Sequence, residues 1–257
     1  MIVRDDRFRS WFRHFEQASL EEPSFAWDEP RRLTPVELAS IAASLQQFQL
    51  GEGAGGKRLL RRGLTFSQRI KDPYFSAALA LFVKEEQRHH ALLGRFLERE
   101  GIPQIEHHWL DGIFRRLRNL AGLELNLRVL VTAETIAVPY YRALERATSS
   151  PLLRALSVRI LSDETAHLRY QAAMLAKLAE VRPAPWRRAA DAFHALLLTA
   201  SAWVVWISHR KALRAGGYSL WSFASETLEA FAGLRCEISR YLAQPAHRSS
   251  EPAAAAR

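Results

Sequence analysis

The chain has 257 residues, of which 48% are hydrophobic, and its formal charge is +9 with a pI near 10.2. This composition excludes a disordered chain, and the length is sufficient for one domain with a large core. The single cysteine, Cys236, excludes an intrachain disulfide and a thiolate-rich zinc site, so any metal site must use carboxylates and imidazoles. The charged N-terminus lacks the apolar run of a signal peptide, so we expect a cytoplasmic protein.

Start and stop signals for helices organise the first half of the chain. Residues 1–33 form an N-terminal extension with a short amphipathic stretch. A capping box then begins at Thr34, with proline at the first helical position, and predicts a helix over residues 34–63. A second helix is expected to begin after Asp72, which precedes a proline, and to end at Gly101.

Two more helices complete a predicted four-helix bundle over residues 34–180. The third runs over about 114–148 and contains Pro139. Ser150 precedes a proline and caps the fourth, which runs over about 151–180. The fold class expected is therefore all-α.

The C-terminal part predicts two further helices, over about 186–214 and 220–242. Together they make up a segment, 181–243, that we expect to pack on the bundle, and the polar tail 244–257 is predicted to be disordered. Residues 192–208 are almost uninterruptedly apolar and are followed by basic residues. We expect this stretch to pack on the bundle or in a homodimer interface, with peripheral membrane contact as the alternative.

Each of the four bundle helices interrupts its apolar stripe with a glutamate, and two of them add a histidine one turn later on the same face. Buried carboxylates need a partner, and four together would repel one another. Two divalent cations would neutralise four carboxylates and also satisfy both imidazoles. The six predicted metal ligands are Glu52, Glu86, His89, Glu134, Glu164 and His167.

Spacing supports this interpretation. Glu52 and Glu86 lie at similar distances on either side of a turn expected near residue 68. Glu134 and Glu164 lie at equal distances from a turn expected near residue 149. At about 1.5 Å of rise per residue, each pair is predicted to sit at matched height in an antiparallel helical hairpin.

A Glu on one helix and Glu-x-x-His on the next, occurring twice, resembles the ferritin-like di-iron carboxylate superfamily. The matching text is Gly51-Glu52, Glu85-Glu86-Gln87-Arg88-His89, Ala133-Glu134 and Asp163-Glu164-Thr165-Ala166-His167. The resemblance implies a ferritin-like four-helix bundle in which each triad of ligands holds one metal, with Glu86 and Glu164 as bridges. It also implies two iron ions, with manganese or a mixed Mn/Fe pair as alternatives.

The resemblance also implies outer partners for the ligands. Glu85, Arg88 and Asp163 occupy positions that in the oxygenase branches form a second shell, and such acids orient metal-bound imidazoles. Ala166 stands where some branches carry arginine, which implies an asymmetric second shell. Tyr141 is expected either to line a substrate cavity or to belong to the core.

The function expected from the resemblance is that of an oxidase or oxygenase that uses O2, an external electron donor and a small organic or lipid-like substrate. Metal storage or peroxide detoxification, as in ferritin or rubrerythrin relatives, is the first alternative. The second is a basic RNA- or membrane-associated protein with a structural metal pair. Nucleic acid is the less favoured partner, because the basic residues are scattered along the chain.

Overall fold

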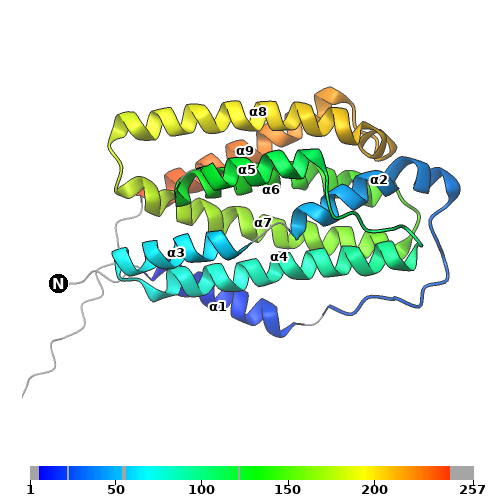
Figure 1. Ribbon diagram of the computed structural model, residues 1–257, viewed down its shortest axis with the longest axis horizontal. Coiled ribbons are helices and arrows are strands. Elements are labelled where there is room, and N and C mark those ends of the chain that lie inside the picture. The colour runs from blue at the N-terminus through cyan, green and yellow to red at the C-terminus, as the bar shows by residue number, and fades with distance from the viewer. Residues whose placement is uncertain (1–5, 22, 54–55, 121, 244–257) are drawn as a thin grey trace, which may run out of the picture.

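The computed structural model describes residues 6–21, 23–53, 56–120 and 122–243, and within these ranges the regular structure is entirely α-helical. Figure 1 shows long helices lying side by side as a bundle, with further helices on its outer faces. In chain order the helices are α1 (Arg7–Leu20), α2 (Pro35–Glu52), α3 (Gly56–Ile70), α4 (Pro73–Arg99), α5 (Trp109–Leu120), α6 (Leu123–Arg146), α7 (Pro151–Glu180), α8 (Ala184–Ala215) and α9 (Leu220–Ala243). The predicted all-α class is confirmed.

The centre of the fold consists of two antiparallel hairpins. Helices α2 and α3 together form one arm of the first hairpin and α4 forms the other, while α6 and α7 make the second. The hairpins contact each other through α3 with α6 and α4 with α7. The connection between α4 and α6 contains α5 and returns along the bundle, so α4 and α6 run in the same direction (Figure 1).

Side-chain caps explain why three of the central helices begin where the sequence predicts. The hydroxyl of Thr34 accepts the backbone N–H of Glu37, whose carboxylate in turn accepts the N–H of Thr34. Asp72 caps α4 and Ser150 caps α7 with their side chains, each followed by a proline. These contacts satisfy backbone donors that a helix start leaves without partners.

The prediction of a single helix over residues 34–63 is wrong. The first helix, α2, ends at Glu52, and a separate helix, α3, runs from Gly56 to Ile70. The turn that follows lies at Lys71, which has a φ of 55°, and not near residue 68. Close packing accounts for the glycines at the break. A Cβ on Gly53 would lie 2.6 Å from the ring of His90, and one on Gly56 would lie 2.2 Å from a methyl group of Val83. Only glycine allows the backbone to approach α4 this closely.

The single helix predicted over 114–148 is also wrong. Helix α5 already begins at Trp109 and ends at Leu120, and Gly122 adopts an extended conformation at the start of α6. The guanidinium of Arg62 donates to the carbonyl oxygen of Arg118 at 2.9 Å, which satisfies one of the carbonyls exposed at the end of α5. Helix α5, outside the bundle, and helix α6, within it, are thus separate helices joined by a short connection.

The remaining helices pack around this centre. Helix α1 in the N-terminal extension lies against α4 and buries Phe8 and Phe15 in the main core. Helix α8 packs on α6 and α2, and α9 packs on α7 and α6. The tail predicted to be disordered, 244–257, falls outside the described residues.

Two glycines in the C-terminal helices should respond in opposite ways to alanine. A Cβ on Gly216 would meet the backbone of Ala143 at 2.3–2.7 Å, so Gly216→Ala should lower the free energy of unfolding by about 1–3 kcal/mol. Gly233 lies exposed inside α9 with open space around it, so Gly233→Ala should raise that free energy by about 0.5–1 kcal/mol. Urea denaturation of both variants measures the two changes in the free energy of unfolding. The same change in both variants would contradict the close contact between Gly216 and Ala143.

The cap at Glu37 predicts a pH-dependent contribution to stability. Burial alone would raise the pKa of Glu37, but hydrogen bonds from Thr34 and from the backbone N–H of Ser149 lower it from 4.5 to about 2. Because the folded-state pKa is depressed, the stabilisation is present above pH 4.5 and disappears as the pH falls towards 2. Glu37→Gln should therefore lose on the order of 1 kcal/mol at pH 6 and show a flatter stability profile below pH 4.5. Urea denaturation across this pH range tests the prediction, with the exposed Glu16→Gln as control.

Candidate metal centre

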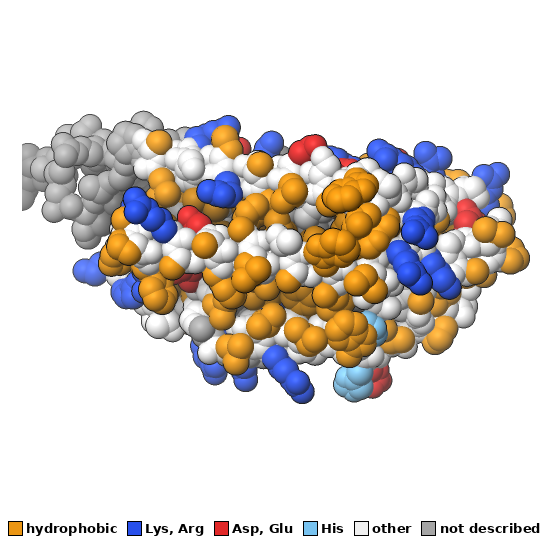
Figure 2. Space-filling view, turned by 90° about the horizontal axis from the view of Figure 1, so that it is seen from above, with side chains coloured by type: hydrophobic (Ala, Val, Ile, Leu, Met, Phe, Trp, Pro, Cys, Tyr) orange, Lys and Arg blue, Asp and Glu red, His pale blue; other side chains and the backbone are white. Residues whose placement is uncertain are grey.

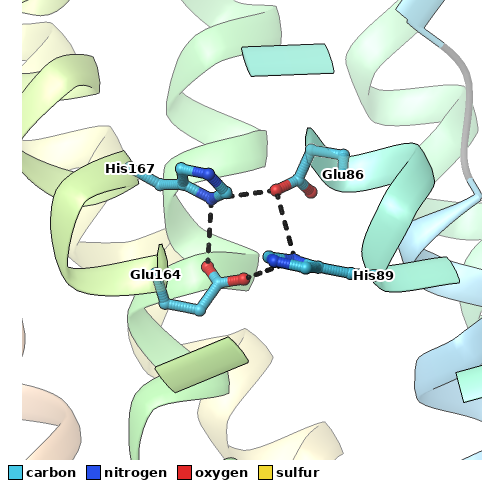
Figure 3. Close-up of side chains that lie close together, drawn as sticks. All are labelled: Glu86, His89, Glu164 and His167. Carbon is cyan, nitrogen blue, oxygen red and sulfur yellow. Dashed lines mark ion pairs between the residues drawn. The ribbon is translucent and has the colours of Figure 1, made fainter. Parts of the chain in front are cut away.

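Four side chains from two helices face one another in the middle of the bundle (Figure 3). Glu86 and His89 come from α4, and Glu164 and His167 come from α7; one donor atom of each lies within 4.8 Å of the others. Nδ1 of His167 lies 2.9 Å from Oε1 of Glu86, and Nδ1 of His89 lies 3.5 Å from Oε1 of Glu164. The three-residue spacing on each helix puts acid and imidazole on one face, as predicted.

Glu52 and Glu134, the other two predicted ligands, come from α2 and α6. The hydroxyl of Tyr141 donates to Glu52, and the side-chain amide of Gln171 donates to Glu134. Both carboxylates line the same cavity as Glu86 and Glu164. The structure therefore brings the predicted carboxylates of all four central helices together.

The imidazoles are held crosswise between the two helices. Nε2 of His89, on α4, lies 3.1 Å from Oδ2 of Asp163 on α7. Nε2 of His167, on α7, lies 3.0 Å from Oε2 of Glu85 on α4. Each acid thus orients the histidine of the opposite helix and leaves that ring's Nδ1 facing the cluster. This is the arrangement by which second-shell acids hold metal-bound histidines.

Each orienting acid has an arginine partner. Arg88 donates to Glu85, its predicted neighbour. On the other helix, Nε of Arg159 donates to Oδ2 of Asp163 at 3.0 Å, which supplies the arginine that Ala166 does not. The sequence-based interpretation missed Arg159. The signal was its position four residues before Asp163, one helical turn away on the same face.

The protonation of the carboxylates follows from their crowding. Burial, and then the charges of Glu86 and Glu164, raise the pKa of Glu52 to about 8. The same causes raise the pKa of Glu134 well above its usual value. The pKa of Glu52 therefore lies above neutral pH, and that of Glu134 is shifted in the same direction, because four adjacent buried charges are too costly.

The imidazoles show the complementary effect. Burial would lower the pKa of His89, but its contacts with Asp163 and Glu164 outweigh burial and raise it to about 10. The pKa of His167 is likewise raised by its acidic neighbours. Protons thus balance the charge of the cluster, and divalent cations would replace those protons on binding.

Several nitrogen and oxygen atoms of the cluster are buried and form no hydrogen bond, although Nδ1 of His167 and Oε1 of Glu86 lie 2.9 Å apart. Such atoms are rare in proteins. Among the described residues they include Oε1 of Glu86, Nδ1 of His89, Oε2 of Glu134, Oε2 of Glu164 and Nδ1 of His167. Metal ions would provide the missing partner for each of them. Carboxylate and imidazole donors suit iron, manganese or a mixed pair, so this buried cluster can bind metal ions without specifying which.

A cavity of about 130 Å³ adjoins the four carboxylates. Its other walls are mainly apolar and come from α2, α5, α6 and α8. They include Phe48, Leu110, Phe114, Val129, Leu130, Ile136, Ala137 and Val205. Tyr141 is fully buried and is not among the residues that line this cavity, so of the two roles expected for it the structure favours the core. It contacts the carboxylate of Glu52 instead.

His209 of α8 also lines the cavity and was missed as a site residue. Its Nδ1 lies 2.8 Å from Oγ of Ser44, which in turn donates to the hydroxyl of Tyr140. Burial, and then the proximity of His108, lower the pKa of His209 to about 4, so the ring is neutral at pH 7. The sequence gives no signal for this contact, because Ser44 and His209 are 165 residues apart.

The geometry of this site is the basis for assigning a function to the chain. Its main features are a buried acid–imidazole cluster, crosswise orienting acids and an adjoining apolar cavity. No protein-family model, no curated protein and no solved structure matches the chain.

Proposed function

We propose that the protein is an oxygen-activating dimetal oxidoreductase built on a ferritin-like four-helix bundle, with iron as the favoured metal. The observation that carries this proposal is the junction of a buried carboxylate–imidazole cluster with a mainly apolar cavity. In the proposed arrangement, Glu52, Glu86 and His89 hold one ion, and Glu134, Glu164 and His167 hold the other.

Such a metal pair, when bound, supplies electrons to O2 so that an organic substrate can be oxidised. The residues around it keep the donors in place. Asp163 and Glu85 accept hydrogen bonds from Nε2–H of the two imidazoles, so that each Nδ1 would present a lone pair once a cation has displaced its proton. Tyr141 and Gln171 each donate a hydrogen bond to one of the outer carboxylates. An external donor would supply the electrons, because a single cysteine cannot form an internal dithiol.

The cavity favours substrate oxidation over metal storage. Its mainly apolar wall would exclude water and hold an apolar part of a substrate beside the carboxylates. A storage protein needs a hydrophilic path along which many ions move, and this cavity offers a poor one. The substrate class we favour is therefore a small organic or lipid-like molecule.

Metal analysis and oxygen uptake test the proposal together. Protein purified without oxygen is loaded with ferrous iron, freed of excess metal, and analysed for iron per chain. We expect two ions per chain, and rapid O2 uptake with a new absorption band when air is admitted. Less than one ion per chain at saturation, or no O2 uptake, would contradict the proposal. A growing mineral core in a large cage on size-exclusion chromatography would instead indicate storage.

A further inference from the structure

Helix α8 is apolar on two faces. Its inner face packs on the bundle with Leu198, Val205, Trp206 and Leu213 buried. Its outer face carries a second apolar row at helical spacing, with exposed fractions of 42% for Phe193, 69% for Leu196, 52% for Trp203 and 62% for Ile207. These two rows explain the nearly uninterrupted apolar sequence, and the outer row has no partner among the described residues.

The apolar surface continues onto α5. Trp109, Ile113 and Leu120 follow one another at steps of four and seven residues and are all exposed. Helices α5 and α8 both contribute side chains to the wall of the cavity beside the metal centre. Figure 2 looks down on this side of the molecule and shows the hydrophobic side chains gathered across it. We call the four exposed residues of α8 and the three of α5 the α5–α8 face.

Basic residues flank this face at both ends of α8. Arg188 is exposed near its start, and Arg210, Lys211 and Arg214 are exposed near its end. Figure 2 shows lysine and arginine side chains around the edges of the apolar area. An apolar strip with tryptophan, flanked by positive charge, is complementary to a membrane interface with anionic lipids.

The other occupants fit less well. Helix α8 is long and apolar enough to cross a membrane, but its inner face is part of the bundle core, so spanning would require it to leave the fold. If a second copy of the chain packed on this face, the basic ends of its α8 would lie against the basic ends of the first α8, in parallel or antiparallel orientation, and would repel them. Nucleic acid would need positive charge at the centre of the face, where Trp203 and Ile207 lie instead.

We propose that the α5–α8 face docks on the surface of an anionic bilayer, with α8 lying parallel to the membrane. The apolar row would enter the boundary between headgroups and acyl chains, to a depth of about 5–10 Å. The flanking Arg and Lys residues would contact lipid phosphates, so salt should weaken the binding. Membrane binding of this kind requires neither metal nor catalysis.

Docking would also specify where the substrate comes from, a consequence that rests on the proposed oxidoreductase function. Leu110 and Phe114 of α5 and Val205 of α8 form part of the cavity wall. The helices that would meet the bilayer are therefore the same helices that enclose the cavity. The substrate class this favours is an amphiphile dissolved in the membrane.

Vesicle flotation tests the docking surface directly with the full chain. One set of vesicles contains phosphatidylcholine alone, and the other contains roughly one third phosphatidylglycerol. We expect the protein to float with the anionic vesicles, to bind phosphatidylcholine at least about tenfold more weakly, and to be released by high salt. The double variant Leu196→Glu/Trp203→Glu should lose binding about tenfold or more, because it places charges in the apolar row.

Leu20→Glu is the control, since Leu20 is an exposed leucine of α1, which lies on the opposite side of the bundle from α8 (Figure 1), and the variant should bind like the parent protein. Circular dichroism checks that each variant is folded. Equal binding by the double variant and the control, or no binding of the parent protein to anionic vesicles, would overturn the proposal. The proposal would also be overturned if the parent protein bound no vesicles but formed a homodimer, and the double variant were monomeric. Iron loading is measured separately, so failure of the metal centre and failure of docking are distinguishable.

Discussion

Glu134→Gln is expected to remove at least one of the two metal ions without unfolding the protein. Burial and its acidic neighbours raise the pKa of Glu134 in the absence of cations and so favour the neutral acid, which a neutral amide of the same size resembles. The hydrogen bond from Gln171 can also persist, because an amide oxygen accepts as a carboxyl oxygen does. What disappears is the negative charge that a cation requires. Iron per chain should fall from two ions to one or fewer.

Thermal unfolding with and without metal separates these effects. In chelator, the variant and the parent protein should unfold within about 0.5 kcal/mol of each other. Added ferrous or manganous ion should stabilise the parent by about 2.7 kcal/mol at a hundred times its dissociation constant, and the variant by much less. Glu145→Gln, a half-buried acid further along α6, is the control and should retain both ions. Full metal content in Glu134→Gln would disprove the assignment of Glu134 as a ligand.

Asp163→Asn and Glu85→Gln are each expected to weaken metal binding by about 10–100-fold. Neither residue is a proposed ligand, but each orients an imidazole from the opposite helix. Replacing the acid with an amide removes the negative charge that makes the imidazole a stronger metal ligand. Because the two acids serve different histidines, the losses of affinity in the double variant should multiply.

Competition with a chelator of known affinity measures these constants, and Glu98→Gln on the exposed face of α4 is the control. A structural role alone would predict lower stability with unchanged metal affinity. The opposite pattern, with weaker affinity and little change of stability in chelator, is the expected one. Metal affinity that does not change in either single variant would exclude the proposed orienting role.

The sequence predicts the central part of the site because its signals are local. A carboxylate on an apolar stripe, with a histidine one turn later, can be read within a single helix. The starts of α2, α4 and α7 are equally local, since Thr34, Asp72 and Ser150 cap them with neighbouring residues. These features needed no knowledge of which helix packs on which.

The features that the sequence could not predict depend on contacts between distant segments. The helix break before α3 depends on two side chains of α4. His90 lies against Gly53, and Val83 lies against Gly56. The role of Tyr141 was open because its partner, Glu52, lies 89 residues away on another helix.

The walls of the cavity were unpredictable for the same reason. They require α5 and α8 to lie against the bundle, and no periodicity within a helix records where it docks. His209 therefore becomes a site residue only once α8 is placed.

The break between α2 and α3 sets Glu52 apart from the other five proposed metal ligands. It is the last residue of α2, whereas the others lie inside α4, α6 and α7 with helical turns on both sides. Helix ends open at a lower free energy than helix interiors. Since Glu52 also borders the cavity, we expect its carboxylate to be the donor that yields most easily when a molecule arrives. The bundle would then combine five fixed ligands with one exchangeable ligand beside the cavity.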